Sequence, residues 1–115
     1  MKKTKTEIRN DVAVISWGGE RLIGEPDNYE LRDEVKNAVE QGIKKIIFDF
    51  SAIKWTNSTG LGILVSAWKI AVTNGAELVV VIDSDRFDNI FKVTNLKAIM
   101  NTYRSIDDAV KYYGE

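Results

Sequence analysis

The chain has 115 residues, 44% of them hydrophobic and 29% charged, which fits one globular domain with a single core. Sixteen basic and seventeen acidic residues leave a net charge of −1, so we expect no nucleic-acid partner, which usually requires a basic excess. The sequence has no cysteine and no histidine, which removes disulfides, thiol nucleophiles, the usual base of serine hydrolases and the commonest zinc ligand. These absences remove most familiar enzyme mechanisms, and we expect a protein that has no cofactor and is not an enzyme.

No stretch has the pattern of a targeting or membrane-spanning segment. The lysines near the N-terminus are not followed by the apolar run of about 7–15 residues that a signal peptide needs. The longest dense apolar stretch, Leu61 to Val72, contains Gly62, Ser66 and Lys69, which makes it too short and too polar to span a bilayer. We expect a cytoplasmic protein without membrane insertion.

The first part of the chain predicts a hairpin followed by a helix. Thr4–Arg9 alternates between two faces, as a half-exposed strand does, and Val12–Trp17 is a second strand. The pair Asn10-Asp11 between them is typical of a turn, so the two strands should be antiparallel. A loop then runs over Gly18–Asp27, and apolar residues at helical spacing predict a helix over Tyr29–Glu40.

Two continuous apolar runs predict strands that are covered on both faces. They are Ile46–Phe50 and Leu78–Ile82, and we expect them to be adjacent, parallel and central. A helix over Ser58–Thr73 should lie between them in sequence and pack on the sheet. The stripe that it should bury consists of Leu61, Leu64, Val65, Trp68 and Val72.

The last part of the chain predicts a helix, a short strand and a final helix. The first helix follows the capping pair Asp83-Ser84 and turns Phe87, Ile90 and Phe91 inward. We place the short strand at Ala98–Asn101. The pattern from Ser105 to Asp108 has the form of a capping box, which predicts a last helix that extends through Tyr113.

These elements predict a single α/β domain. It has a mixed sheet of about five strands, in which the opening hairpin is antiparallel and the later strands are largely parallel, with about four helices. In such sheets, functional sites tend to lie outside the carboxyl ends of the parallel strands. The segment from Phe50 to Gly62 lies at that edge.

This segment places several hydroxyl groups at the start of a helix. In a structural interpretation, Asn57 or Ser58 is the N-cap and accepts a hydrogen bond from a backbone N–H of the first turn. In a functional interpretation, Ser58 is an exposed hydroxyl that receives a phosphate, which would add about −1.5 to −2 charges. Residue spacing alone leaves both open. Trp55, just before this start, is either packed in the core or partly exposed on a binding face.

Two other features of the segment carry weaker signals. Asp49 stands at a strand end, as the phosphoacceptor of receiver domains does, but no acidic pair follows the first strand to bind magnesium. We predict a turn or helix-capping role for Asp49. The pair Gly60-x-Gly62 lacks the third glycine and the lysine of nucleotide-binding loops.

The motif Asn57-Ser58-Thr59-Gly60-Leu61-Gly62 resembles the Asp-Ser-Ser/Thr-Gly-Leu-Gly signature of bacterial anti-sigma-factor antagonists, the STAS domains. Four further segments resemble the same family, in the same order along the chain. They are Ile47–Ser51, Asn74–Val81, Phe91–Leu96 and Tyr103–Val110. The resemblance covers nearly the whole chain and implies that residues 1–115 form a single STAS domain.

The resemblance also implies a phosphate-controlled exchange of partners. Ser58 would be phosphorylated by an anti-sigma factor that is itself a serine kinase of the ATPase-kinase fold, and a serine phosphatase would be a further partner. The unphosphorylated domain would bind the anti-sigma factor and free a sigma factor, whereas the phosphorylated domain would dissociate. The implied binding surface consists of Gly19, Glu20, Trp55, Asn57, Ser58, Thr59, Gly60 and Leu61. We expect a monomer or a weak dimer.

The chain departs from the family pattern in four places, one of which is Asn95 in place of the glycine of Thr-Gly-Leu. Asn57 stands where the signature has aspartate, which removes a negative charge beside Ser58. Gly19-Glu20 matches the family, but Arg21-Leu22 follows where an aspartate is expected. The loop Gly18–Asp27 is also longer than in the family. A second interpretation is therefore a constitutive STAS interaction module without a phosphate cycle, either in a stress-signalling assembly or as a lipid-transport subunit.

Overall fold

In the computed structural model, which describes residues 3–23 and 29–114, five strands form the main sheet in the order β1-β2-β4-β6-β7. The pair β1–β2 is antiparallel, and all the later pairs are parallel. The strands are β1 (Thr4–Arg9), β2 (Val12–Trp17), β4 (Lys45–Asp49), β6 (Glu77–Val81) and β7 (Thr102–Tyr103). The predicted mixed sheet, its opening hairpin and the adjacent parallel central strands are therefore confirmed.

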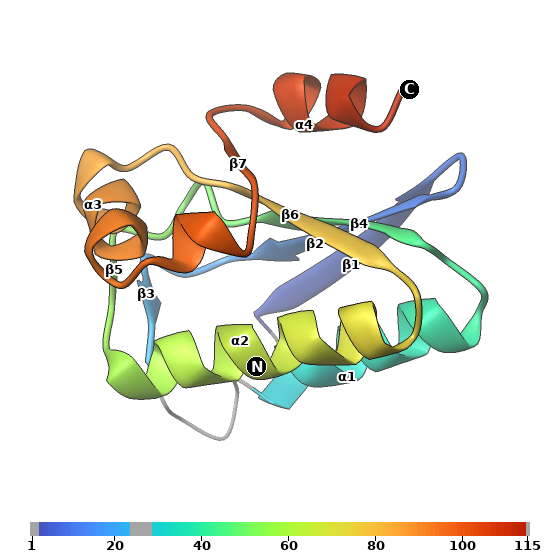
Figure 1. Cartoon of the computed structure of the whole chain (residues 1–115), viewed down its shortest axis with the longest axis horizontal. Coiled ribbons are helices and arrows are strands. Elements are labelled where there is room, and N and C mark those ends of the chain that lie inside the picture. Colours follow the sequence, from blue (N-terminus) through green and yellow to red (C-terminus); the bar gives the residue numbers. More distant parts are fainter. Residues whose placement is uncertain (1–2, 24–28, 115) are drawn as a thin grey trace.

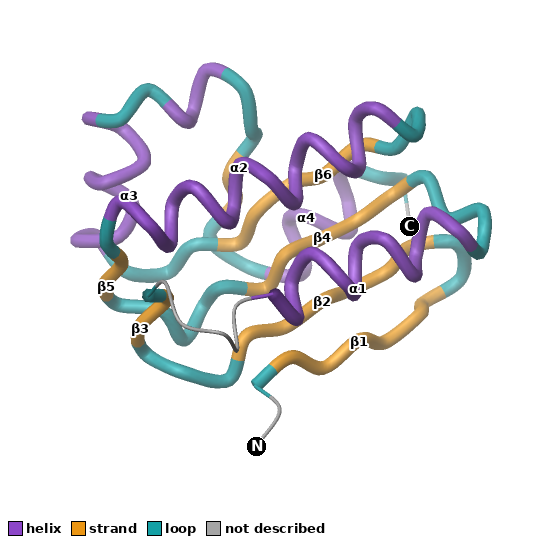
Figure 2. The backbone as a smooth tube through the Cα atoms, turned by 90° about the horizontal axis from the view of Figure 1, so that it is seen from below, coloured by secondary structure: helices purple, strands orange, loops and turns teal. Residues whose placement is uncertain are grey.

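The described part of the chain has four α-helices, three of which cover the two faces of this sheet (Figures 1 and 2). They are α1 (Tyr29–Glu40), α2 (Ser58–Thr73), α3 (Asp85–Val93) and α4 (Ile106–Tyr112). Helices α1 and α2 lie side by side on one face, and α4 lies on the other. Helix α3 lies beyond one end of the sheet (Figure 1).

The alternation of side chains along the strands divides the apolar residues into two clusters. Within β2, Ala13, Ile15 and Trp17 join the larger cluster with α1, α2 and α3, whereas Val12 and Val14 join the smaller one with α4. The same division holds in β4 and β6. A strand that is covered on both faces must be apolar at every position, and this explains the continuous apolar runs in the sequence.

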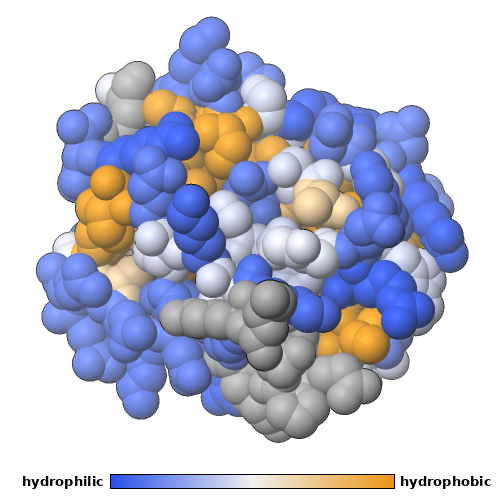
Figure 3. Space-filling model, turned by 180° about the vertical axis from the view of Figure 1, so that it is seen from behind, coloured by the Kyte–Doolittle hydropathy of each residue, from blue (hydrophilic) through white to orange (hydrophobic). Residues whose placement is uncertain are grey.

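Strand β1 is an exposed edge strand. Thr4 is its one buried residue, and Ile8 is 45% exposed, so β1 is more exposed than its alternation predicts. Apart from Thr6, its remaining positions carry lysine, glutamate and arginine, which discourage pairing with another strand. On the face of the molecule opposite to that in Figure 1, hydrophilic residues surround separate hydrophobic patches (Figure 3).

Helix α2 begins and ends at the predicted residues, but its buried stripe differs from the predicted one. The fully buried positions are Gly60, Leu64, Ala67 and Ala71, with Leu61, Val65 and Trp68 partly buried beside them. Val72 is 45% exposed, so its assignment to the buried stripe is wrong. The small side chains of Ala67 and Ala71 bring the helix axis close to its neighbours, and Val72 lies roughly 100° around the helix from Ala71.

The strand predicted at Ala98–Asn101 is also wrong. This segment begins in a 3₁₀ turn over Leu96–Ala98, and the last strand, β7, begins only at Thr102. Asn95 adopts the left-handed conformation with φ of 65° and separates α3 from the turn. Leu96 and Met100 both insert into the larger core, and their spacing of four residues suits a helical turn rather than a strand.

Candidate functional site

Two short strands outside the main sheet connect the segments that the sequence singled out. Strand β3 (Arg21–Leu22) pairs in parallel with β5 (Trp55–Thr56) at one end of the molecule (Figure 1). The backbone of Glu20 strengthens the junction, because its carbonyl accepts hydrogen bonds from the N–H of Lys54 at 2.7 Å and of Trp55 at 3.2 Å. The segment after β2 and the turn before α2 therefore form one surface.

Asn57, and not Ser58, is the N-cap of α2. Its backbone is extended, and its side-chain Oδ1 accepts a hydrogen bond from the N–H of Gly60 at 2.7 Å. An amide oxygen performs this role as well as a carboxylate does, so the replacement of aspartate by asparagine retains the cap. Ser58 is the first helical residue. It is exposed, and its hydroxyl makes no hydrogen bond to the described residues.

This division of roles leads to a prediction on stability. Asn57→Ala should lower the free energy of unfolding by about 0.5–2 kcal/mol, because it leaves the N–H of Gly60 without its partner. Ser58→Ala should change it by no more than about 0.5 kcal/mol, because an exposed hydroxyl without partners is removed. Denaturant midpoints of the two variants measure the difference. A greater loss in Ser58→Ala would show that the serine has a structural role.

The remaining residues of the expected surface differ in their exposure. Glu20, Ser58 and Thr59 are exposed, and Gly19, Trp55, Asn57 and Leu61 are half-buried. Gly60 is buried. A Cβ atom at Gly60 would lie 2.3 Å from the carbonyl oxygen of Leu22, so its role is to allow β3 to approach the helix.

Asp49 forms the turn that follows β4. Its Oδ1 accepts hydrogen bonds from the N–H of Ser51 at 3.2 Å and from the Ser51 hydroxyl at 2.7 Å. The predicted turn role of Asp49 is thereby confirmed. The next residue, Phe50, stacks on Phe48 with ring centroids 4.9 Å apart, and its ring centroid lies 6.4 Å from that of Phe87 in α3. These aromatic contacts position α3 next to the turn.

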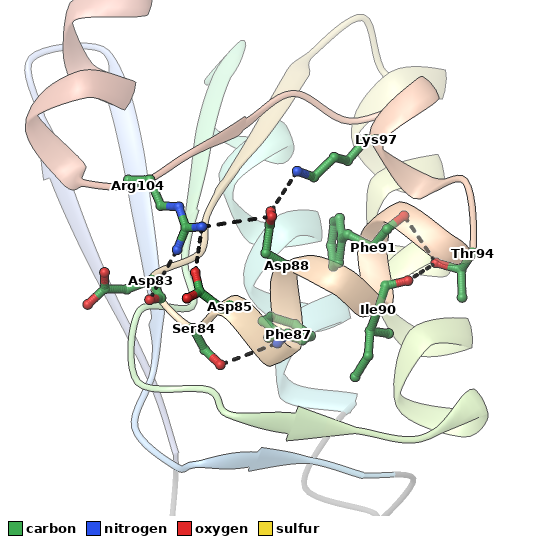
Figure 4. Close-up of polar contacts among 10 residues, drawn as sticks. All are labelled: Asp83, Ser84, Asp85, Phe87, Asp88, Ile90, Phe91, Thr94, Lys97 and Arg104. Atoms are coloured by element: carbon green, nitrogen blue, oxygen red, sulfur yellow. Dashed lines mark hydrogen bonds and ion pairs between the residues drawn. The ribbon is translucent and has the colours of Figure 1, made fainter.

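A cluster of charged residues holds the start of α3 (Figure 4). The guanidinium of Arg104 lies 2.8 Å from Asp85 and 3.9 Å from Asp88, and Lys97 lies 2.7 Å from Asp88. The hydrogen bond with Asp85 raises the pKa of Arg104 above its ordinary value. As predicted, Ser84 caps the helix, since its hydroxyl accepts a hydrogen bond from the N–H of Phe87.

A hollow of about 370 Å³ opens between β3, β5 and α3, and Arg21, Trp55 and Arg86 line it. We call it the Arg-Trp hollow. Both arginines are exposed, and Trp55 is half-buried. Sequence reasoning left open whether Trp55 is packed or partly exposed, and it missed both arginines, because only the pairing of β3 with β5 and the position of α3 bring them together. No local sequence signal marks them.

Other kinds of site are not found in the described residues. Among residues 3–23 and 29–114, no group of three or more acidic, histidine or cysteine side chains could hold a metal ion. No helix in that part of the chain is long and apolar enough to cross a membrane.

The fold and the motif at the start of α2 are those of a known protein family. The STAS domain pattern matches residues 3–109, and the chain belongs to the STAS domain family. A curated relative, the anti-sigma-B factor antagonist of Staphylococcus aureus, is 32% identical over 81 residues, which are 68% of this chain and 75% of the relative.

Solved structures have the same fold. A putative anti-sigma factor antagonist from Thermotoga maritima matches with a TM-score of 0.82 and 19% identity, over 97% of this chain and 95% of that one. The Bacillus cell fate determinant SpoIIAA in its phosphorylated form matches with a TM-score of 0.70 and 17% identity, over 96% of this chain and 98% of that one.

Proposed function

We propose that this STAS domain is an anti-sigma factor antagonist that exchanges partners under the control of a phosphate on Ser58. In its unmodified form it binds an anti-sigma factor that is a serine kinase of the ATPase-kinase fold. The kinase transfers the γ-phosphoryl group of ATP to the Ser58 oxygen, ADP leaves, and the modified domain dissociates. A serine phosphatase restores the hydroxyl.

The observation that carries this proposal is the free hydroxyl at the start of α2. Asn57 caps the helix, so Ser58 contributes no hydrogen bond to the described structure and lies exposed at the first helical position. A kinase can therefore reach its oxygen without unfolding the helix. The curated relatives named as anti-sigma-B factor antagonists, and the phosphorylated form of SpoIIAA, support the same function.

A phosphate at Ser58 would be compatible with the fold and incompatible with a tight interface. Helix N-termini favour anions, because the helix dipole and the free N–H groups both stabilise negative charge. The first turn of α2 has no acidic residue, so the phosphate would turn a neutral patch into an anionic one. Burying this charge against a partner costs several kcal/mol unless the partner supplies matching cations.

The proposal predicts opposite behaviour for two Ser58 variants with the cognate anti-sigma factor. Ser58→Ala should bind this kinase as wild type does but accept no phosphate, whereas Ser58→Asp should bind about tenfold more weakly or worse. Calorimetry measures the affinities, and transfer of labelled phosphate from ATP measures the modification. Thr59→Ala is the matched control, since its neighbouring hydroxyl should not matter to phosphorylation.

The second candidate is a constitutive interaction module, which the uncharged Asn57 beside Ser58 favours. In that case Ser58 would take up no phosphate, and Ser58→Asp would bind the domain's partner as tightly as wild type. This result would overturn the switch at Ser58. Uptake of phosphate by Ser58→Ala would overturn the assignment of Ser58 as the acceptor.

A further inference from the structure

The Arg-Trp hollow lies on the same surface as Ser58. Arg21 comes from β3, Trp55 from β5 and Arg86 from the first turn of α3. Trp55 and Ser58 are three positions apart, which places their Cα atoms within about 11 Å of each other. A partner that covers the start of α2 is therefore well placed to contact the hollow.

The acidic residues of α3 do not neutralise the hollow. Asp85 and Asp88 are both bound by cations from the C-terminal part of the chain, Asp85 by Arg104 and Asp88 by Lys97 and Arg104 (Figure 4). Within the described residues, Arg86 makes no ion pair or side-chain hydrogen bond. Its guanidinium is exposed and is available to an incoming carboxylate.

Arg21, the strand partner of Trp55 in the β3–β5 pair, likewise has no counter-charge among the described residues. Its side chain makes no ion pair or hydrogen bond to the residues that the structure describes, and it is exposed. Glu20 precedes it in sequence, but Lys54, next to Trp55, offsets that charge. Among the described residues that line the hollow, both charged side chains are arginines, although the chain as a whole has a net charge of −1.

The residue types and the shape of the hollow favour a protein segment as its occupant. Tryptophan and arginine are the side chains most often found at the energetic centre of protein interfaces. A guanidinium binds a carboxylate through two parallel hydrogen bonds, and an indole face packs against an apolar side chain. The hollow is open to solvent, whereas a small-molecule site encloses most of its ligand.

We propose that the Arg-Trp hollow anchors an acidic segment of the protein partner. Arg21 and Arg86 bind carboxylates of that segment, and Trp55 packs against an apolar side chain between them. This inference rests on the proposed function, since it states the chemistry that the partner presents to the same surface. A phosphate on Ser58 has the same sign of charge as this acidic segment, so it repels the segment and assists release.

The first experiment uses a defined probe and needs no kinase. The full chain is titrated by NMR with the peptide acetyl-Gly-Glu-Glu-Leu-Gly-Glu-Glu-Leu-Gly-amide, and the indole N–H signal of Trp55 is followed. Trp55→Phe identifies this signal among those of Trp17 and Trp68. We expect a saturable shift of the Trp55 signal with this peptide, no shift with a peptide carrying lysine in place of glutamate, and loss of the shift in Arg21→Glu.

Three results of this titration would overturn the anchor. They are the absence of a shift, an equal shift with the lysine peptide, and an equal shift with inorganic phosphate. The third result would indicate a site for small anions instead of an acidic protein segment. All three are independent of whether Ser58 is ever phosphorylated.

The second experiment measures the affinity for the cognate anti-sigma factor with Ser58 intact. Arg21→Glu and Arg86→Glu should each weaken binding about tenfold or more. Arg9→Glu on the edge strand β1 is the matched charge reversal and should bind as wild type does. If the kinase phosphorylates Ser58 and binds both hollow variants as tightly as wild type, the anchor is refuted while the proposed function stands. If the acidic peptide shifts Trp55 but Ser58 accepts no phosphate, the proposed function fails while the anchor stands.

Discussion

Gly60→Ala should lower the free energy of unfolding by about 3 kcal/mol, in the upper part of the range for overpacked interiors. Its new Cβ would lie 2.3 Å from the carbonyl oxygen of Leu22 and 2.4 Å from the hydroxyl of Thr56. These two atoms are hydrogen-bonded to each other at 2.6 Å. Relief of the clash therefore requires β3 to move away from the start of α2.

The matched control is Gly62→Ala in the same helix. A Cβ at Gly62 meets nothing within 4 Å, and alanine is favoured over glycine inside a helix by about 0.5–1 kcal/mol. The same substitution two residues away should thus raise the stability. Denaturant unfolding with an unchanged slope measures both variants. A stable Gly60→Ala protein would show that β3 does not pack against the helix as described.

Leu64→Ala should lower the free energy of unfolding by about 2–5 kcal/mol, the range for truncation of a fully buried leucine. Leu64 has no exposed surface and belongs to the larger core between α2 and the sheet. Domains of this size are stable by only about 5–15 kcal/mol, so the variant should lose a large fraction of its stability. Chemical denaturation at constant temperature measures this loss.

Val72→Ala is the control for Leu64→Ala, because both truncate an aliphatic side chain of the same helix. Val72 is 45% exposed, and alanine is the better helix former, so the change should lie within about 0.5 kcal/mol of zero. If the two variants lost stability equally, the orientation of α2 on the sheet would be wrong. Neither substitution touches the surface around Ser58.

Local signals in the sequence determined much of this protein. The turn residue Asn10, which has φ of 56°, and the caps Asn57, Ser84 and Ser105 act through hydrogen bonds or dihedral angles within a few residues. Such signals are readable because the chemistry that they need is adjacent in the chain. The bounds of α2 and the existence of the hairpin followed from them and from apolar periodicity. The central parallel strands followed as well, although each begins and ends one residue earlier than predicted.

The family signature placed Ser58 at the start of a helix but did not separate a cap from an exposed hydroxyl. The structure distinguishes a cap from an exposed hydroxyl. An N-cap residue has an extended backbone, and its side-chain oxygen accepts a hydrogen bond from the backbone N–H three residues further on. Asn57 has both properties. Because Asn57 is the cap, the hydroxyl of the next residue, Ser58, makes no hydrogen bond to the described residues and is free for modification.

Tertiary structure alone decided the remaining features of the site. The pairing of β3 with β5 joins residues 34 positions apart, and two residues per strand are too few to leave a periodic pattern. The segment Ala98–Asn101 is not a strand, because Leu96 and Met100 both pack in the larger core and their spacing of four residues suits a helical turn. Arg21 and Arg86 are marked by no local sequence signal. They line the same hollow as Trp55 only because elements that are distant in the sequence pack together there. Contacts between residues that are close in the chain produce recognisable local sequence patterns. Contacts between distant residues depend on how the whole chain packs, so no local pattern predicts them.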